Sequence, residues 1–372
     1  MTKFYCLAIE RNIRLDCTSQ SELKILPCCA YQTQQVYSSL EEYNSSPEIQ
    51  QLKLSTDWPV GCNMCQQQES LGQTSYRNHA NQALKTATGR RYEIMPSNVC
   101  NLRCVMCDST HSTALAHERF MVGLDNINIA HEIDHGHQQL AILEQDNNIE
   151  SISLIGGEFF LSKSNLEFLD FAIRRQIPLR VVTNATVILA THLQKLQQIP
   201  DLELQISIDG VGAGYEFMRY PAKWSVFDAT VDRLLTNLPG AKINFNMVAQ
   251  ALNLQQLIPV MHYANQHRQP LRVTNLVAPD HLTWAILHTD EKENLTSFIN
   301  EQLQQYQLAQ VQVQEVKKYL DMLDNVEYSP QLKQKFEDYV LAIYSRRNID
   351  WPALKELNLH PRVRSTVFYP LN

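Results

Sequence analysis

Three cysteines, Cys100, Cys104 and Cys107, have the spacing CxxxCxxC directly after a short apolar segment. Cysteine thiolates are the usual protein ligands of iron-sulfur clusters. Three thiolates on one loop can hold three corners of a four-iron cube and leave the fourth iron open to another ligand. The spacing therefore predicts a cluster with one accessible iron.

Two other interpretations fit the triplet taken alone. Residues at i, i+4 and i+7 share one helix face, and cysteine is often buried, so the three could be core residues. Cys104 and Cys107 could also join Cys62 and Cys65 in a zinc ribbon. The gap between those two pairs is longer than the roughly 15 to 20 residues usual for such a site. The chain that follows favours the cluster.

After the triplet, β-branched runs alternate with amphipathic ones. The pattern predicts strands at 91–95, 149–155, 179–183, 202–208, 242–248 and 271–277. It predicts helices at 166–175, 188–199, 227–238 and 254–264, the third with Ser225 and Asp228 as a capping box. This alternation indicates an α/β fold with a parallel sheet, and six such units make an open, partial barrel. Active sites of such barrels lie at the carboxyl ends of the strands.

Glycine and polar residues stand at these predicted strand ends. They are Gly156, Gly157 and Glu158 after the second strand, Asn184 after the third, and Ser207 and Arg219 at and after the fourth. A Gly-Gly turn, a turn asparagine or a surface arginine would each be ordinary alone. Their recurrence in order at successive strand ends indicates a single site.

Together with Asn101 and Leu102 after the first cysteine, these motifs resemble those of the radical S-adenosylmethionine (SAM) enzymes. The resemblance implies a partial (β/α)6 TIM-like barrel and a 4Fe-4S cluster held by the triplet. The open iron of such a cluster chelates SAM and sends an electron into its sulfonium, which releases a 5′-deoxyadenosyl radical. An electron donor such as flavodoxin or ferredoxin is implied as well.

The resemblance also assigns roles to residues. Gly157 and Glu158, with Gly156, would hold the amino group of SAM, and Ser207 would face its ribose or carboxylate. Arg219 would pair with the SAM carboxylate, which suits the bidentate guanidinium fork. Asn184 belongs to a Thr-Asn-Gly motif of the family, in which this chain has Ala185 in place of the glycine.

All nine cysteines of the chain lie before residue 108, six of them in the first 90 residues. Their setting resembles the auxiliary-cluster module called twitch (or SPASM-like), which follows the barrel in the best-known members and precedes it here. The implied ligands of a second 4Fe-4S cluster are Cys6, Cys28, Cys62 and Cys65. Cys29 could replace Cys28, and a zinc site built from the same four residues is the alternative. Cys17 is expected to be a spectator.

Length and composition agree with an enzyme of several parts. We expect an auxiliary module at 1–90, the barrel at 91–285 and a helical region at 286–372. The net charge is −7 and the arginines are scattered, which argues against a nucleic-acid partner. The sequence has no apolar run of the roughly 18 residues that span a membrane, and its start does not resemble a signal peptide. A cytoplasmic location is expected, where cysteines serve as ligands rather than disulfides.

One motif suggests another chemistry. His131, Glu132 and His135 satisfy HExxH, in which two histidines one helical turn apart bind zinc and the glutamate activates water. The longer pattern that supplies a third histidine is not met, because Gln138 and Ala141 occupy its glycine and histidine positions. We therefore expect a polar face of an outer helix here, with a zinc hydrolase as the remote alternative.

The reaction class is better specified than the substrate. Members of this family with an extra cluster often modify peptides, so the resemblance favours a ribosomal peptide or protein side chain. The alternatives are a dehydrogenase or cyclase acting on a small molecule, and a non-catalytic zinc scaffold. The helical region, with periodic stretches at 311–323 and 332–344, is either a cover of the barrel or a substrate-binding lid.

Overall fold

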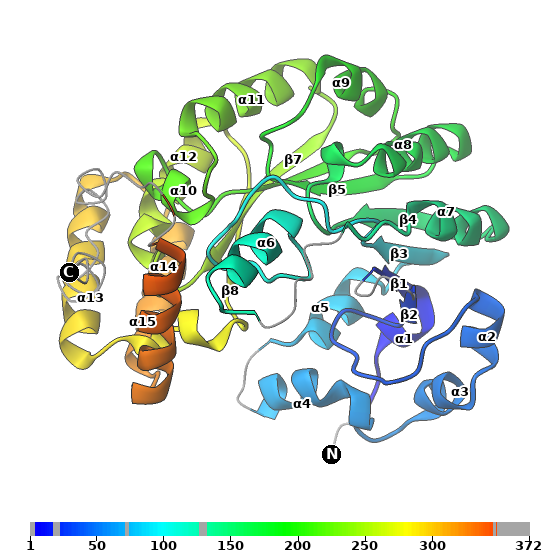
Figure 1. Ribbon diagram of the computed structural model, residues 1–372, viewed down its shortest axis with the longest axis horizontal. Coiled ribbons are helices and arrows are strands. Elements are labelled where there is room, and N and C mark those ends of the chain that lie inside the picture. The colour runs from blue at the N-terminus through cyan, green and yellow to red at the C-terminus, as the bar shows by residue number, and fades with distance from the viewer. Residues whose placement is uncertain (1–3, 18–22, 71–73, 126–131, 345–346, 348–372) are drawn as a thin grey trace.

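A computed structural model describes residues 4–17, 23–70, 74–125, 132–344 and 347. Its centre is one eight-stranded sheet in the order β2-β1-β3-β4-β5-β6-β7-β8, parallel throughout except for the antiparallel pair β1 and β2. The strands are β1 Asn12–Asp16, β2 Lys24–Leu26, β3 Arg90–Ile94, β4 Ile149–Leu154, β5 Leu179–Thr183, β6 Glu203–Ser207, β7 Lys242–Ala249 and β8 Leu271–Asn275. The sheet curves into an open barrel (Figure 1).

Helices cover the outer face of the sheet (Figure 1). They are α7 Gly136–Gln145, α8 Lys163–Arg175, α9 Ala190–Leu196, α11 Trp224–Asn237 and α12 Leu257–Gln266. Burial alternates along β7, so that Phe245 faces outward and its ring lies 5.5 Å from that of Tyr263 in α12. The fully buried Phe168 and Phe227 anchor α8 and α11 in the same layer. Each such side chain contributes about 1.5–3 kcal/mol by leaving water.

All six predicted barrel strands are present, displaced by at most two residues at either end, and the α/β fold with a parallel sheet is confirmed. Two further strands, β1 and β2, come from the N-terminal region and extend the sheet beyond β3. The predicted capping box of α11 is wrong, because the helix begins at Trp224 and has no side-chain cap. Ser225 therefore lies inside the first turn.

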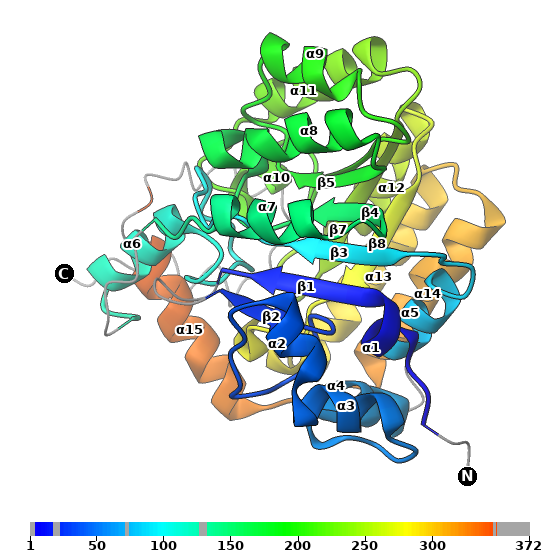
Figure 2. The same cartoon turned by 90° about the vertical axis from the view of Figure 1, so that its right-hand side faces the viewer.

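The N-terminal helices α1 Leu7–Arg11, α2 Leu40–Ser45, α3 Pro47–Leu54, α4 Asn63–Ser70 and α5 Tyr76–Ala83 gather beside β1 and β2 (Figures 1 and 2). Ser46 caps α3 with Pro47 in its first turn, and Ser75 forms a capping box with Asn78 at α5. Arg11 donates hydrogen bonds to the carbonyls of Leu84 and Ala87, which joins α1 to the chain entering the barrel.

The remaining helices lie at the mouth and open side of the barrel. They are α6 Thr113–Met121, α10 Ala213–Met218, α13 Thr289–Gln305, α14 Gln310–Asp324 and α15 Pro330–Tyr344. The chain also has short 3-10 turns: η1 Val60–Cys62 in the N-terminal region, and η2 Phe159–Leu161, η3 Leu254–Gln256, η4 Asp280–Leu282 and η5 Trp284–Ile286 in the rest of the described residues. The predicted helical C-terminal region is thus present. None of the helices in the described residues has the length and apolarity needed to cross a membrane.

Candidate active site

The cysteine triplet lies on a loop that leaves the carboxyl end of β3. Two backbone amides fix this loop against the segment after α10: Arg103 N donates to Tyr220 O at 2.7 Å, and Val105 N donates to Met218 O at 2.9 Å. The three thiols are partly buried and near one another, since charge on Cys104 and Cys100 raises the pKa of Cys107. The chain segment that carries the triplet is not helical, so the helix-face interpretation is wrong.

Burial raises the pKa of all three thiols, that of Cys100 to about 12. Thiolates are therefore unfavourable here unless positive charge enters the site, as ligated iron would provide. Across the described residues, no three His, Cys, Asp or Glu side chains converge as they would around a single metal ion. Three thiols at CxxxCxxC spacing are a donor set that fits an iron-sulfur cluster.

Gly156 and Gly157 allow the loop after β4 to lie against the segment that leads into Cys100. Gly156 has a φ of 120°, and a Cβ on Gly157 would come within 2.2 Å of the Val99 carbonyl oxygen. Gly157 N donates to Ser97 O at 3.1 Å and Glu158 N donates to Val99 O at 2.7 Å. The glycines are thus required by a close backbone approach and not only by the turn.

Glu158 is buried at the centre of this arrangement. Its carboxylate accepts hydrogen bonds from Thr183 Oγ1 and from Asn184 N, both at 2.7 Å. Burial raises its pKa to about 7, and these hydrogen bonds offset only part of that effect. A carboxylate held this way favours a cationic ligand such as an ammonium group.

The raised pKa of Glu158 predicts a pH dependence of folding. The folded chain retains a proton that the unfolded chain loses, so this stabilisation is complete below pH 4.5 and is lost as the pH rises through about 7. When the pH is raised from 5 to 8, the free energy of unfolding of the metal-free wild-type protein should fall. This fall should be about 2–3 kcal/mol larger than the fall in the Glu158→Gln variant. Urea titrations of both proteins at the two pH values test this; equal pH slopes would contradict it.

Asn184 ties the end of β5 to the cysteine loop. Its side-chain amide donates to Asn101 Oδ1 at 3.0 Å, and Asn101 in turn donates to Thr186 Oγ1 at 2.9 Å. Ala185, where the family motif has glycine, adopts a left-handed φ of 57° and is fully buried. That conformation costs about 1–2 kcal/mol for a residue with a Cβ, and the burial of its methyl group offsets part of the cost.

Arg219 directs its guanidinium toward the cysteine loop, with Nη1 3.9 Å from Cys104 Sγ. Asp209 holds it there through a contact of 2.5 Å between Arg219 Nη2 and Asp209 Oδ2, with both side chains buried. Burial opposes the arginine charge, but Asp209 and Cys104 outweigh it and keep the pKa of Arg219 above its usual value. Asp209 was not identified as a site residue from the sequence, although its position directly after β6 was a usable signal.

Ser207 is the last residue of β6 and is half-buried. By register it alternates with Ile206, which pairs with the outward-facing Phe245 of β7, so Ser207 faces the inside of the barrel. Glycines 156 and 157, Glu158, Asn184, Ser207 and Arg219 therefore lie at the carboxyl ends of consecutive strands, as the sequence predicted.

A family model described as the radical SAM superfamily matches residues 94–264, the stretch that contains these residues. Residues 94–264 form a radical SAM domain. The matched segment begins at the last residue of β3 and contains β4 through β7, the cysteine loop and the outer helices between these strands. No curated protein matches the sequence.

Several solved structures are similar to the enzyme. Streptococcus suis SuiB bound to precursor peptide SuiA shares 15% identity over 66% of this chain and 60% of that chain, with a TM-score of 0.42. Native anSMEcpe with bound AdoMet shares 17% sequence identity over 58% of this chain and 62% of that chain, with a TM-score of 0.40. The radical SAM methyltransferase TsrM from Kitasatospora setae shares 12% sequence identity over 52% of this chain and 37% of that chain, with a TM-score of 0.39. The chain spans less than two thirds of each of these proteins.

A second cysteine group lies in the N-terminal region of the enzyme. Cys6 precedes α1, Cys28 follows β2, Cys62 ends η1 and Cys65 lies in α4. All four line one small cavity of about 20 Å³, whose other walls include Phe4, Trp58, Tyr76 and Arg77. Burial, together with charge on Cys6 and Cys65, raises the pKa of the Cys62 thiol to about 12.

Cys28 and Cys29 point in different directions although they are neighbours. Cys28 lines the cavity, whereas Cys29 is exposed and lies near Arg14 and Glu93, charged residues of β1 and β3. Cys17 is buried elsewhere, against Met95 and Ile133. The four cysteines predicted to hold the second cluster therefore line one cavity.

Arg77 brings a positive charge to the cavity of the second cysteine group. It pairs with Glu69, donates to the carbonyl of Tyr5 at 2.8 Å, and lies 5.0 Å from the ring of Trp58. Its charge lowers the pKa of the Cys6 and Cys62 thiols against the larger effect of burial.

The HExxH segment does not form the expected helix. His131 lies outside the described residues, residues 132–134 are non-helical, and His135 is the residue before α7. The segment instead pairs with the chain before the cysteine loop, with Ile133 N donating to Asn98 Oδ1 at 2.8 Å and His135 N to Pro96 O at 3.0 Å. The expectation of a polar helix face is wrong, and the helical spacing that HExxH needs to bind zinc is not met.

Proposed function

We propose that the enzyme cleaves SAM reductively to a 5′-deoxyadenosyl radical, which abstracts hydrogen from a side chain of a ribosomal peptide or protein. The observation that carries the reaction class is the convergence of the cysteine loop, Glu158, Asn184 and Arg219 at neighbouring strand ends of a radical SAM domain. When bound, the 4Fe-4S cluster supplies the electron for this cleavage.

The chain's own residues would bind and orient SAM. Glu158 is buried and favours a cation, which suits the amino group of the methionine moiety. Arg219 is held by Asp209 close to Cys104, which suits the SAM carboxylate. Asn184 connects both regions through Asn101. These side chains would thus already be held in place before SAM binds, so that binding SAM would cost little further side-chain entropy.

We further propose that Cys6, Cys28, Cys62 and Cys65 hold a second, fully ligated cluster. Four thiols at one cavity supply enough ligands for four irons. A zinc site from the same four residues is the alternative, and metal and sulfide analysis of the protein separates the two. Such a cluster lacks an open iron, so its role would be electron transfer with a substrate radical, or structural support.

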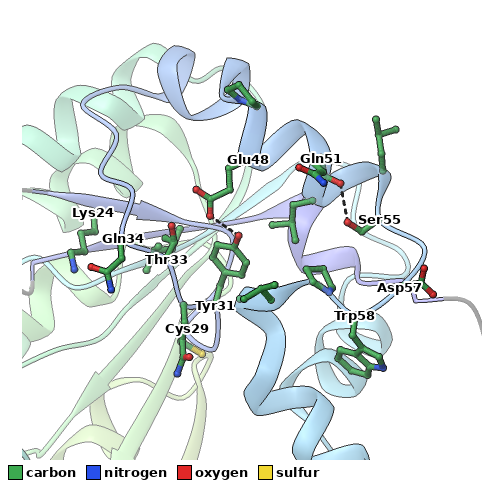
Figure 3. Close-up of a pocket in the computed structure, with 18 of the residues that line it drawn as sticks. Lys24, Cys29, Tyr31, Thr33, Gln34, Glu48, Gln51, Ser55, Asp57 and Trp58 are labelled. Carbon is green, nitrogen blue, oxygen red and sulfur yellow. Dashed lines mark hydrogen bonds between the residues drawn. The ribbon is translucent and has the colours of Figure 1, made fainter.

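A large pocket in the N-terminal region supports a peptide substrate (Figure 3). Its volume is about 1380 Å³, whereas small-molecule pockets are about 300–1,000 Å³. Its lining includes Asp16 and Lys24, which pair in register on β1 and β2, and Gln34 and Gln51, whose amides suit peptide backbone groups. Tyr31 and Trp58 line both the pocket and the second cysteine cavity.

Removing two ligands of the proposed second cluster tests whether the two clusters have different roles. Cys62→Ala with Cys65→Ala should remove about half of the iron, keep SAM cleavage in the absence of substrate, and lose substrate turnover. Anaerobic iron analysis and chromatography of 5′-deoxyadenosine provide the measurements. A folded variant without the second cluster that still forms full product would overturn the proposal.

The substrate class is tested with a short peptide encoded beside the gene, incubated with enzyme, SAM and reduced flavodoxin or ferredoxin. Mass spectrometry of the peptide should show a modification that depends on SAM. Turnover of a small alcohol or nucleotide, with no change in the peptide, would favour the dehydrogenase or cyclase instead. Zinc without acid-labile sulfide would contradict both enzyme activities.

A further inference from the structure

The C-terminal region holds the cysteine loop from the side opposite the barrel. The backbone N–H groups of Arg103 and Val105 are bonded to residues 220 and 218, as described above. Their carbonyl groups are bonded to C-terminal residues: Tyr339 Oη donates to Val105 O, and Arg347 Nη2 donates to Arg103 O, both at 2.8 Å. The segment that carries Cys104 is therefore bonded on both edges.

Arg347 is itself fixed by a buried ion pair. Its Nε lies 3.0 Å from Glu118 Oε1 and its Nη2 lies 2.6 Å from Glu118 Oε2, and the two side chains are 0% and 3% exposed. Glu118 belongs to α6, the helix that follows the cysteine loop. The guanidinium also lies 5.0 Å from the ring of Tyr220, next to Arg219. Figure 2 shows α6 and α15 side by side at this end of the barrel.

The charge of Arg347 reaches the cysteine loop. Arg347 Nη2 donates at 2.8 Å to the carbonyl of Arg103, the residue directly before Cys104, and Arg219 Nη1 lies 3.9 Å from Cys104 Sγ, so two cations lie beside this part of the loop. Arg219 has the role proposed above toward SAM. Arg347 contacts the loop through the Arg103 carbonyl and has no such role, so its effect on the sulfur is separate.

We propose that Arg347 is a positioning residue of the radical site, which fixes the cysteine loop together with Tyr339 and raises the reduction potential of the cluster bound there. The reduced cluster carries one more negative charge than the oxidised one, and a buried cation stabilises it. This inference rests on the proposed function, because it requires a cluster at Cys100, Cys104 and Cys107. The C-terminal region would then be part of the radical site and not only a cover.

The test is the midpoint potential of the SAM-responsive cluster in the full chain, followed by electron paramagnetic resonance. Arg347→Met should shift the reduction equilibrium about tenfold toward the oxidised form, which is about 59 mV for one electron. Arg347→Lys retains the charge and should restore most of the potential. Lys335→Met is the matched control, because Lys335 lies on α15 and pairs with Asp280 at the surface, where its loss should leave the potential unchanged.

Tyr339→Phe tests the positioning role without changing charge. Loss of its hydrogen bond should speed amide exchange in residues 103–107, measured by mass spectrometry, with little change in potential. Failure of a folded Arg347→Met chain to assemble the cluster would also support positioning. A wild-type potential in Arg347→Met together with wild-type exchange in Tyr339→Phe would overturn the inference. Absence of any cluster at the triplet in the wild-type enzyme would instead overturn the proposed function.

Discussion

Replacing Cys100, Cys104 and Cys107 together by alanine is expected to remove about half of the iron and sulfide from the reconstituted enzyme. Under the proposed function, two four-iron clusters per chain would give roughly eight irons, and the triplet would hold one of the two clusters. The remaining four should stay, because the second cysteine group lies in a separate cavity lined by Phe4 and Trp58.

Anaerobic iron and sulfide analysis provides the measurement. Cys17→Ala is the control, because Cys17 is buried against Met95 and Ile133 and should not affect iron content. Full iron in the triple variant would show that the loop holds no cluster. Loss of all iron would show that the two cysteine groups do not bind independently.

Asp209→Ala is expected to cost about 3–5 kcal/mol in the free energy of unfolding, since it leaves the buried Arg219 without its partner. It also removes the acceptor of Val248 N, which bonds to Asp209 Oδ1 at 2.8 Å. Arg219→Ala should weaken SAM binding by about 1.5–3 kcal/mol, because a charge-assisted contact is lost.

Urea denaturation and SAM titration of both variants, and of the double variant, separate the two effects. The double variant should be more stable than Asp209→Ala alone, because it no longer buries an unpaired guanidinium. A loss below about 1 kcal/mol in Asp209→Ala would show that Arg219 finds another partner. Wild-type SAM affinity in Arg219→Ala would assign the carboxylate to a different residue.

The barrel was predictable because its strands are short apolar runs with strong turn signals between them. Phe245 and Ile206 face outward beneath helices, so burial leaves a clear pattern in the sequence. Strand β1 was not predicted, because its charged Arg14 and Asp16 are buried through an ion pair with each other and, for Arg14, with Glu93 of β3. Such ion pairs offset the cost of burying the charges only in the folded protein, and no local sequence pattern predicts them.

The site was predictable at strand ends and not where distant segments meet. Glu158 and Arg219 stand in motifs at predicted strand ends. Arg347 meets Glu118 across 229 positions of sequence, and neither residue belongs to a motif. The HExxH prediction failed for a related reason: the segment bonds to the chain before the cysteine loop at Pro96 and Asn98, and this tertiary pairing replaces a helix.

Cleavage of SAM by reduced enzyme without substrate is the most direct test of a radical site at the cysteine loop. Anaerobic enzyme with reductant and SAM should release 5′-deoxyadenosine and methionine in equal amounts, and the Cys100, Cys104 and Cys107 triple variant should release neither. Chromatography with mass detection quantifies both products. Intact SAM after incubation with iron-loaded wild-type enzyme, or cleavage that persists in the triple variant, would contradict a radical site at this loop.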